Sequence, residues 1–136
     1  MVALIHEVNI HASAQVCFQA VTDLSLLRQW HLGKVDGSVQ LGEELVLLPK
    51  PHLQFILKTA EWTPNQRLVQ TLVSGAGHQS VVTELTPLAD GRTRVRLTHD
   101  GWEENDPNIA QCNMQWGAAL HRLSLFLETS DSEVAS

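Results

Sequence analysis

Cysteine is scarce in this sequence, and its placement excludes several classes of site. Cys17 and Cys112 are too far apart in the chain to form the close pair of a metal site, and two residues are too few for a disulfide framework. Apolar side chains flank the first of them, at Val16 and Phe18. This pattern indicates small core thiols in a protein from a reducing compartment.

Positive charge and long apolar runs are scarce as well. The 9 Lys and Arg residues face 15 Asp and Glu residues, which gives a net charge of -6. A chain with this balance repels the phosphate backbone, so nucleic acid is not an expected partner. No run reaches the roughly 18 apolar residues of a membrane span, and the N-terminal segment lacks the basic flank of a signal peptide. We therefore expect a cytoplasmic protein without a membrane span.

The sequence does contain enough apolar material for one core. Its 136 residues are 43% hydrophobic and 18% charged, a balance typical of a globular domain. The last residues are rich in Ser, Asp and Glu. We expect one domain over residues 1–129 and a frayed C-terminal tail over residues 130–136.

The first segments predict a strand followed by two short helices. Residues Val2–Ile10 alternate with a period of two, and His6 is the one polar residue on the apolar, inward face. Ser13 is placed to cap the first helix, and Asp23 or Ser25 to cap the second. The chain therefore begins with a strand and a helical connection.

The middle of the chain predicts consecutive antiparallel hairpins. One hairpin determines its own register, because an inner face shared by Leu85 and Val95 requires a three-residue turn that ends at a left-handed Gly91. The same register pairs Glu84 with Arg96. The expected strands are Glu44–Leu48, His52–Trp62, Arg67–Val73, Gln79–Pro87 and Thr93–His99.

The last part of the chain predicts one long amphipathic helix. Asp106 is expected at its N-cap, Pro107 at its first position and Thr129 near its end. The order of elements predicts an α+β fold, in which a curved antiparallel sheet of about six strands wraps around this helix. Its apolar stripe consists of Ile109, Cys112, Trp116, Ala119, Leu120, Leu123 and Leu127.

Short segments over nearly the whole chain have the residues and spacing of a known family. They are Ala20–Asp23, Leu27–Trp30, Trp62–Val69, Glu84–Pro87, Asp90–Thr93 and Leu97–Trp102, together with Trp116 and Leu120 on the last helix. In this order they resemble the homologues of the activator of the heat-shock-protein-90 ATPase, in the START-like (SRPBCC, birch-pollen-allergen-like) superfamily.

The resemblance implies a helix-grip fold with a cavity between the sheet and the C-terminal helix. In that superfamily the cavity commonly holds apolar small molecules. Two departures concern this cavity. The family often has a second Trp after the one matched by Trp30, where this chain has His31, and it often has Gly before the helix Trp, where this chain has Gln115. Both departures change the mouth or the floor of the expected cavity.

Six residues are candidates for ligand binding in such a cavity. His6 and His99 are expected on inward faces of neighbouring strands, either meeting inside the cavity or serving as two separate core histidines. The seven histidines show no metal-ligand spacing, so we expect no metal and no cofactor and assign no catalytic residue. The other candidates are Trp30, Trp102 in the loop before the helix, Cys112 and Trp116.

Three functions are compatible with these residues. The first is binding of a small hydrophobic or amphipathic molecule, such as a lipid, a polyketide or an aromatic metabolite. The second is a cyclase/aromatase-like or hydrolase-like enzyme that uses His6 or His99 for acid-base chemistry. The third is a co-chaperone-like module that binds another protein. Pairing of two copies into a homodimer is a further expectation.

Overall fold

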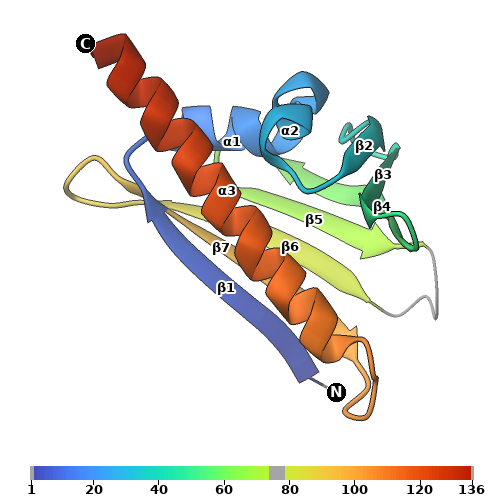
Figure 1. Cartoon of the computed structure of the whole chain (residues 1–136). Coiled ribbons are helices and arrows are strands. Elements are labelled where there is room, and N and C mark those ends of the chain that lie inside the picture. Colours follow the sequence, from blue (N-terminus) through green and yellow to red (C-terminus); the bar gives the residue numbers. More distant parts are fainter. Residues whose placement is uncertain (1, 74–78, 136) are drawn as a thin grey trace.

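In the computed structural model, an antiparallel sheet curves around one long helix (Figure 1). The structure describes residues 2–73 and 79–135, and its description of side chains ends at residue 128. The predicted α+β helix-grip fold is confirmed. The elements are β1 (Val2–Ile10), α1 (Ala14–Thr22), α2 (Leu24–Trp30), β2 (Lys34–Gly37), β3 (Glu44–Lys50), β4 (Leu53–Thr63), β5 (Arg67–Leu72), β6 (Ser80–Pro87), β7 (Thr93–Trp102) and α3 (Ile109–Ala135).

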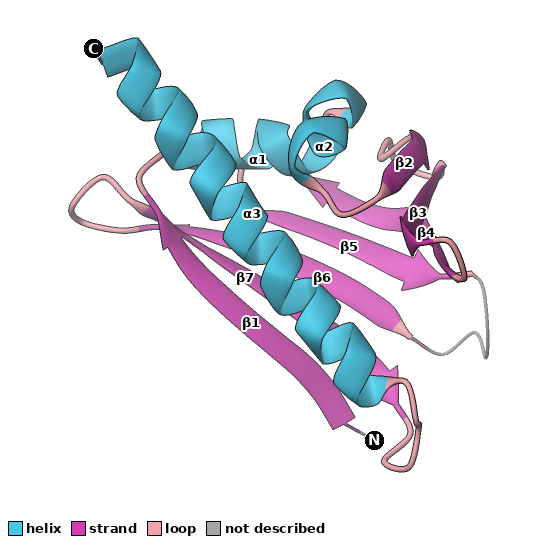
Figure 2. Ribbon diagram, viewed as in Figure 1, coloured by secondary structure: helices cyan, strands magenta, loops and turns pink. Residues whose placement is uncertain are grey.

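The sheet has seven strands in the order β1-β7-β6-β5-β4-β3-β2. The first strand therefore lies beside the last one, and the hairpins follow each other across the rest of the sheet. Figure 2 shows all three helices on the same face of the sheet, with α3 crossing it. Register shifts in β1, β3 and β4 bend the strands, as bulges do. This curvature creates the space that α3 fills.

The predicted hairpin register is confirmed between β6 and β7. Leu85 pairs with Val95 and Glu84 pairs with Arg96. The turn is closed by the Leu88 N–H, which donates to the Arg92 carbonyl over 2.8 Å. Gly91 has a φ of 85°, in the left-handed region that glycine adopts at low cost.

One strand was not expected from the sequence. The short edge strand β2 falls in a stretch that glycines interrupt, and its burial pattern has a single buried residue, Val35. A strand of this length shows no alternation that sequence reasoning detects. It is held instead by pairing with β3, in which Val35 lies opposite Leu47.

Both ends of α3 differ from the prediction, whereas the caps of α1 and α2 agree with it. Asp106 accepts a hydrogen bond from the Asn108 N–H at 2.8 Å. It therefore closes a turn before the helix instead of capping it, which is a common use of Asp. The helix continues to Ala135 rather than ending near Thr129. As predicted, Ser13 and Asp23 are the N-caps of the two short helices.

The core lies between the inner face of the sheet and α3. The stripe predicted on α3 is buried at Cys112, Trp116, Ala119, Leu120, Leu123 and Leu127. Strand β7 runs beyond His99, so that Trp102 ends this strand instead of standing in the following loop. Within residues 2–73 and 79–135, no helix is both long and apolar enough to cross a membrane.

Candidate ligand-binding site

Three hollows lie in a row between α3 and the sheet. We call them the inner cavity, of about 40 Å³, the middle gap, of about 10 Å³, and the outer hollow, of about 370 Å³. The inner cavity and the middle gap share His31, Leu47 and Trp116 in their walls. The middle gap and the outer hollow share Phe55 and Cys112. The shared walls place the three hollows next to one another, in order from the core to the protein surface.

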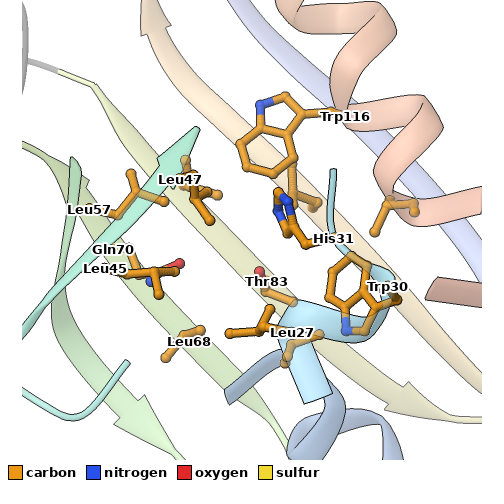
Figure 3. Close-up of a pocket in the computed structure, with 14 residues that line it drawn as sticks. Leu27, Trp30, His31, Leu45, Leu47, Leu57, Leu68, Gln70, Thr83 and Trp116 are labelled. Atoms are coloured by element: carbon orange, nitrogen blue, oxygen red, sulfur yellow. The ribbon is translucent and has the colours of Figure 1, made fainter. Parts of the chain in front are cut away.

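The inner cavity has a mostly apolar wall that contains three polar side chains. Leu45, Leu47, Leu57 and Leu68 form much of the wall on the sheet. The polar residues are His31, Gln70 and Thr83, which we call the cavity group. Figure 3 shows them among the apolar residues that line the cavity. No Lys, Arg, Asp or Glu is among the residues that line it.

Gln70 brings an unpaired donor into this wall. Its side chain is 5% exposed, and its Nε2 atom has no hydrogen-bond partner within the described residues. The alternation of β5 explains the burial, because Leu68, Gln70 and Leu72 all face inward. A buried polar atom without a partner costs free energy unless water or a ligand supplies one.

His31 is a neutral donor in the same wall. Burial lowers its pKa to about 4; the hydrogen bond with Leu32 opposes this shift, and the charge of Arg122 adds to it. Its Nδ1 atom lies 2.9 Å from the Leu32 nitrogen and 3.4 Å from the Leu32 carbonyl oxygen. The shorter contact requires Nδ1 to accept from the Leu32 N–H, which assigns the proton of the neutral ring to Nε2. Within the described part of the chain, Nε2 has no hydrogen-bond partner.

His99 belongs to a different, fully bonded arrangement. The Trp116 indole N–H donates to its Nδ1 atom over 2.8 Å, and its Nε2 atom therefore carries the proton and donates to Gln79 Oε1 over 2.7 Å. Burial lowers the pKa of His99 to about 4, and Asp100 opposes this shift. We call His99, Trp116 and Gln79 the His99 cluster. It leaves no ring nitrogen free to exchange a proton with a ligand.

His6 lies apart from these groups. Its Nε2 atom is 2.8 Å from Asn113 Oδ1 on α3, and it packs beside Gly117. In the sheet, Leu4 rather than His6 lies opposite His99. Among the described residues, no hydrogen bond joins the two histidines, and His6 is not in the walls of the three hollows.

The remaining candidates all line the row. Trp30 and Trp116 are in the wall of the inner cavity, and the Trp30 indole N–H donates to the Ala20 carbonyl at 2.8 Å. Trp102 lines the outer hollow, is 3% exposed and has no partner for its Nε1 atom within the described residues. Cys112 lies between the middle gap and the outer hollow, where burial, with a contribution from Asp106, raises its pKa to about 11. Their contact with a ligand stays a prediction.

Sequence reasoning missed two residues of the cavity group and noted the third only as a departure from the resembled family. Gln70 and Thr83 are polar residues on the inward faces of otherwise apolar strands. A polar residue on the apolar face of a predicted strand is also the pattern that identified His6. The same criterion applied to the later strands identifies Gln70 and Thr83. Among the described residues, no group of three or more His, Cys, Asp and Glu side chains is arranged to hold a metal ion.

A comparison with protein-family models shows the family to which this chain belongs. The family model described as activator of Hsp90 ATPase homolog 1-like protein matches residues 11–128. This chain belongs to that family. No curated protein sequence matches it.

Solved structures support the fold of this chain. The Aha1 dimer from Colwellia psychrerythraea is similar with a TM-score of 0.85 and 24% identity, over 94% of this chain and 97% of that one. An HSP90 activator from Plasmodium falciparum has a TM-score of 0.75 and 18% identity, over 93% and 96%. DynU16, a putative protein in the dynemicin biosynthetic locus, has a TM-score of 0.80 and 22% identity, over 94% and 48%.

Proposed function

We propose that this protein binds a small, uncharged, amphipathic molecule in the row of hollows between the sheet and α3. The outer hollow carries this proposal. Its volume of about 370 Å³ lies in the range of small-molecule sites, and its wall mixes apolar residues such as Phe55 and Leu72 with polar ones such as Gln79 and Asn108. This combination holds an apolar body and orients a polar group.

The unpaired indole N–H of Trp102 supports binding in this hollow. The atom is buried and lacks a protein acceptor within the described residues, although its ring lines the hollow. Indole donors that are buried usually find a partner. An oxygen atom of a ligand, or a water molecule that the ligand replaces, completes this hydrogen bond.

Charge in the walls favours an uncharged ligand. The inner cavity has no charged side chain in its wall, and Asp106 is the one carboxylate among the residues that line the outer hollow. An anion would be buried without a countercharge, which costs several kcal/mol on the scale of buried ions. The similarity in fold to DynU16, a putative protein in the dynemicin biosynthetic locus, is also consistent with the proposal of a small-molecule ligand.

The geometry gives less support to catalysis. His6 and His99 are the candidates for acid-base chemistry. Hydrogen bonds occupy both ring nitrogens of His99, and His6 is not in the walls of the three hollows. The dimer from Colwellia psychrerythraea and the activator from Plasmodium falciparum support two further proposals, a homodimer of this chain and contact with a chaperone ATPase. Light scattering measures the first, and co-purification with the purified ATPase measures the second.

A titration followed by NMR tests the proposed ligand site. The probe is methyl pentyl ketone, and the reporters are the indole N–H resonances of the four tryptophans. We expect saturable shifts of Trp102 and Trp116, which line the row. Trp62, which packs on the edge of Phe18 outside the three hollows, is the internal control and stays unchanged. Absence of any saturable shift, or equal shifts of all four resonances, contradicts the proposal.

A variant that fills the row gives a second test. Cys112→Leu adds bulk between the middle gap and the outer hollow, so we expect it to weaken ketone binding about tenfold or more. Met114→Leu is the matched control on the same helix, since Met114 is 75% exposed and faces away from the row. Equal affinities of the two variants, both folded by circular dichroism, would place the ligand elsewhere.

A further inference from the structure

We propose that the inner cavity is a recognition site for an uncharged acceptor oxygen, such as a ketone or amide carbonyl, and that Gln70 selects it. This inference rests on the proposed function and names the class of polar group that the ligand carries. Gln70 is a binding residue in this proposal, because its amide donates directly to the ligand.

Gln70 combines an unpaired donor with a place in the wall of a small cavity. The Gln70 amide nitrogen is buried without a partner among the described residues, and its side chain lines the inner cavity. The cavity volume of about 40 Å³ accommodates a polar end of a few heavy atoms, or about three water molecules at roughly 10–15 Å³ each. A whole drug-sized ligand does not fit, so the rest of the molecule extends along the row.

The other two polar residues of the inner cavity, His31 and Thr83, can also donate hydrogen bonds. The His31 tautomer is set by the Leu32 N–H, which leaves the Nε2–H of His31 as a donor. The Thr83 hydroxyl lines the same cavity and has no side-chain hydrogen bond within the described residues. The N–H groups of Gln70 and His31 and the Thr83 hydroxyl can all donate to an acceptor oxygen. An ammonium group would find only the Gln70 amide oxygen and the Thr83 hydroxyl, and no carboxylate.

The wall of the inner cavity disfavours a charged ligand. The cavity wall contains no Lys, Arg, Asp or Glu. The cation whose charge acts on His31 is Arg122, but this side chain is exposed, and its Nε atom donates to the Trp30 carbonyl over 2.7 Å. A carboxylate in the cavity would lack a buried countercharge, whereas a carbonyl oxygen needs only the hydrogen bonds.

The middle gap specifies the shape of the remainder. It measures about 10 Å³ and lies between Leu47 and Phe55 on the sheet and Trp116 on α3. A thin, unbranched chain passes such a gap with less displacement of the wall than a fused ring system. The ligand therefore has an acceptor oxygen in the inner cavity and an unbranched apolar segment that leads toward the outer hollow, where the Trp102 indole N–H pairs with water or with a second oxygen of a longer ligand.

Three probes with the same pentyl tail separate these properties. They are methyl pentyl ketone, the alkene in which a methylene group replaces its oxygen, and hexanoate. Dissociation constants come from titrations that monitor the Trp102 and Trp116 indole resonances. We expect the ketone to bind about tenfold more tightly than the alkene, and hexanoate to bind more weakly than the ketone by at least about tenfold.

The variant Gln70→Leu tests the role of the donor. It has nearly the same size as the wild-type residue and removes the amide. We expect the preference for ketone over alkene to fall about tenfold, while alkene binding remains. Gln111→Leu, on the exposed face of α3, is the matched control and retains the preference. In the wild type, the Gln70 side-chain NH₂ resonances, identified by their loss in Gln70→Leu, should shift with the ketone but not with the alkene.

Each other outcome overturns a definite statement. If ketone and alkene bind equally, or if Gln70→Leu leaves their ratio unchanged, the inner cavity holds only water and the inference is wrong while the proposed function stands. Binding of hexanoate as tight as that of the ketone refutes the requirement for an uncharged group. If none of the three probes shifts Trp102 or Trp116, the proposed function fails, and this inference fails with it.

Discussion

Two sets of polar side chains are buried against α3, and they differ in how their hydrogen bonds are satisfied. In the His99 cluster, Trp116 and Gln79 occupy both ring nitrogens of His99. In the cavity group, the amide nitrogen of Gln70 has no partner within the described residues. The first set is complete within the protein, whereas the second needs an atom from outside.

The paired set stabilises the fold, whereas the unpaired set can bind a ligand. A buried polar network in which every member is paired rigidifies the core and holds the Trp116 ring at the edge of the inner cavity. An unpaired donor such as Gln70 lowers stability in the free protein, but it supplies a specific interaction when an acceptor enters. Residues of similar polarity on the same sheet therefore have opposite energetic roles.

Acidification should produce the largest loss of stability. It acts on one histidine in each set, His31 in the cavity group and His99 in the His99 cluster. Burial lowers the pKa values of His31 and His99 to about 4, from an ordinary value of 6.5 in the unfolded chain. Between pH 6.5 and pH 4 the unfolded state therefore binds more protons than the folded state. The free energy of unfolding is at its full value above pH 6.5 and decreases as the pH falls toward 4. The loss amounts to roughly 3 kcal/mol for each histidine. Urea unfolding at several pH values between 4 and 7 measures it.

Single variants measure how much of this loss of stability at low pH comes from each histidine. His31→Leu and His99→Leu should each reduce the steepness of the decline in unfolding free energy by about half. His121→Leu, at an exposed position on α3, serves as the control and should retain the wild-type slope. An unchanged slope in both buried variants would show that neither histidine is neutral because of burial.

Removal of His99 should have the next largest effect. In His99→Leu at pH 7, the Trp116 N–H and the Gln79 amide oxygen both lose their partner. We expect the unfolding free energy to fall by about 1–3 kcal/mol, the cost of leaving the buried Trp116 N–H unpaired, because the half-buried Gln79 side chain can bind water instead. Chemical denaturation measures the change, with His121→Leu again expected within about 0.5 kcal/mol of the wild type. A neutral His99→Leu would contradict the structural role of the cluster.

Removal of Gln70 should have the smallest effect and the opposite sign. Gln70→Leu replaces an unpaired buried amide by an apolar side chain of similar size in a wall of leucines. We expect the ligand-free protein to be unchanged or more stable by up to about 1 kcal/mol. Thermal and chemical denaturation without ligand provide the measurement. A loss of more than about 2 kcal/mol would mean that the amide is already paired, as in the His99 cluster.

Much of the fold was predictable because its determinants are local. Ser13 and Asp23 cap helices through bonds to N–H groups two or three residues away. The turn at Gly91 and the pairing of Leu85 with Val95 follow from the alternation of two adjacent strands. The edge strand β2 was not predictable, because its pairing with β3 rather than its own sequence defines it.

The candidate site was only partly predictable. Trp30, Trp102, Cys112 and Trp116 line the row of hollows, as expected for an apolar stripe that faces a sheet. Gln70 was missed, although the pattern that selected His6 also applies to it. Sequence patterns predict which face of a strand a residue occupies, but they do not predict whether its side chain has a hydrogen-bond partner in the folded protein.

The sequence alone determined the class of fold, the inward positions of its polar residues and a charge that disfavours nucleic acid, because periodicity and composition act through local and additive physics. Only the tertiary structure decided which of these polar residues are satisfied. His99 meets Trp116 across a separation of 17 residues, and Gln70 meets no acceptor within the described chain. Hydrogen bonding depends on distance and direction between elements, and these are set when the sheet closes on α3.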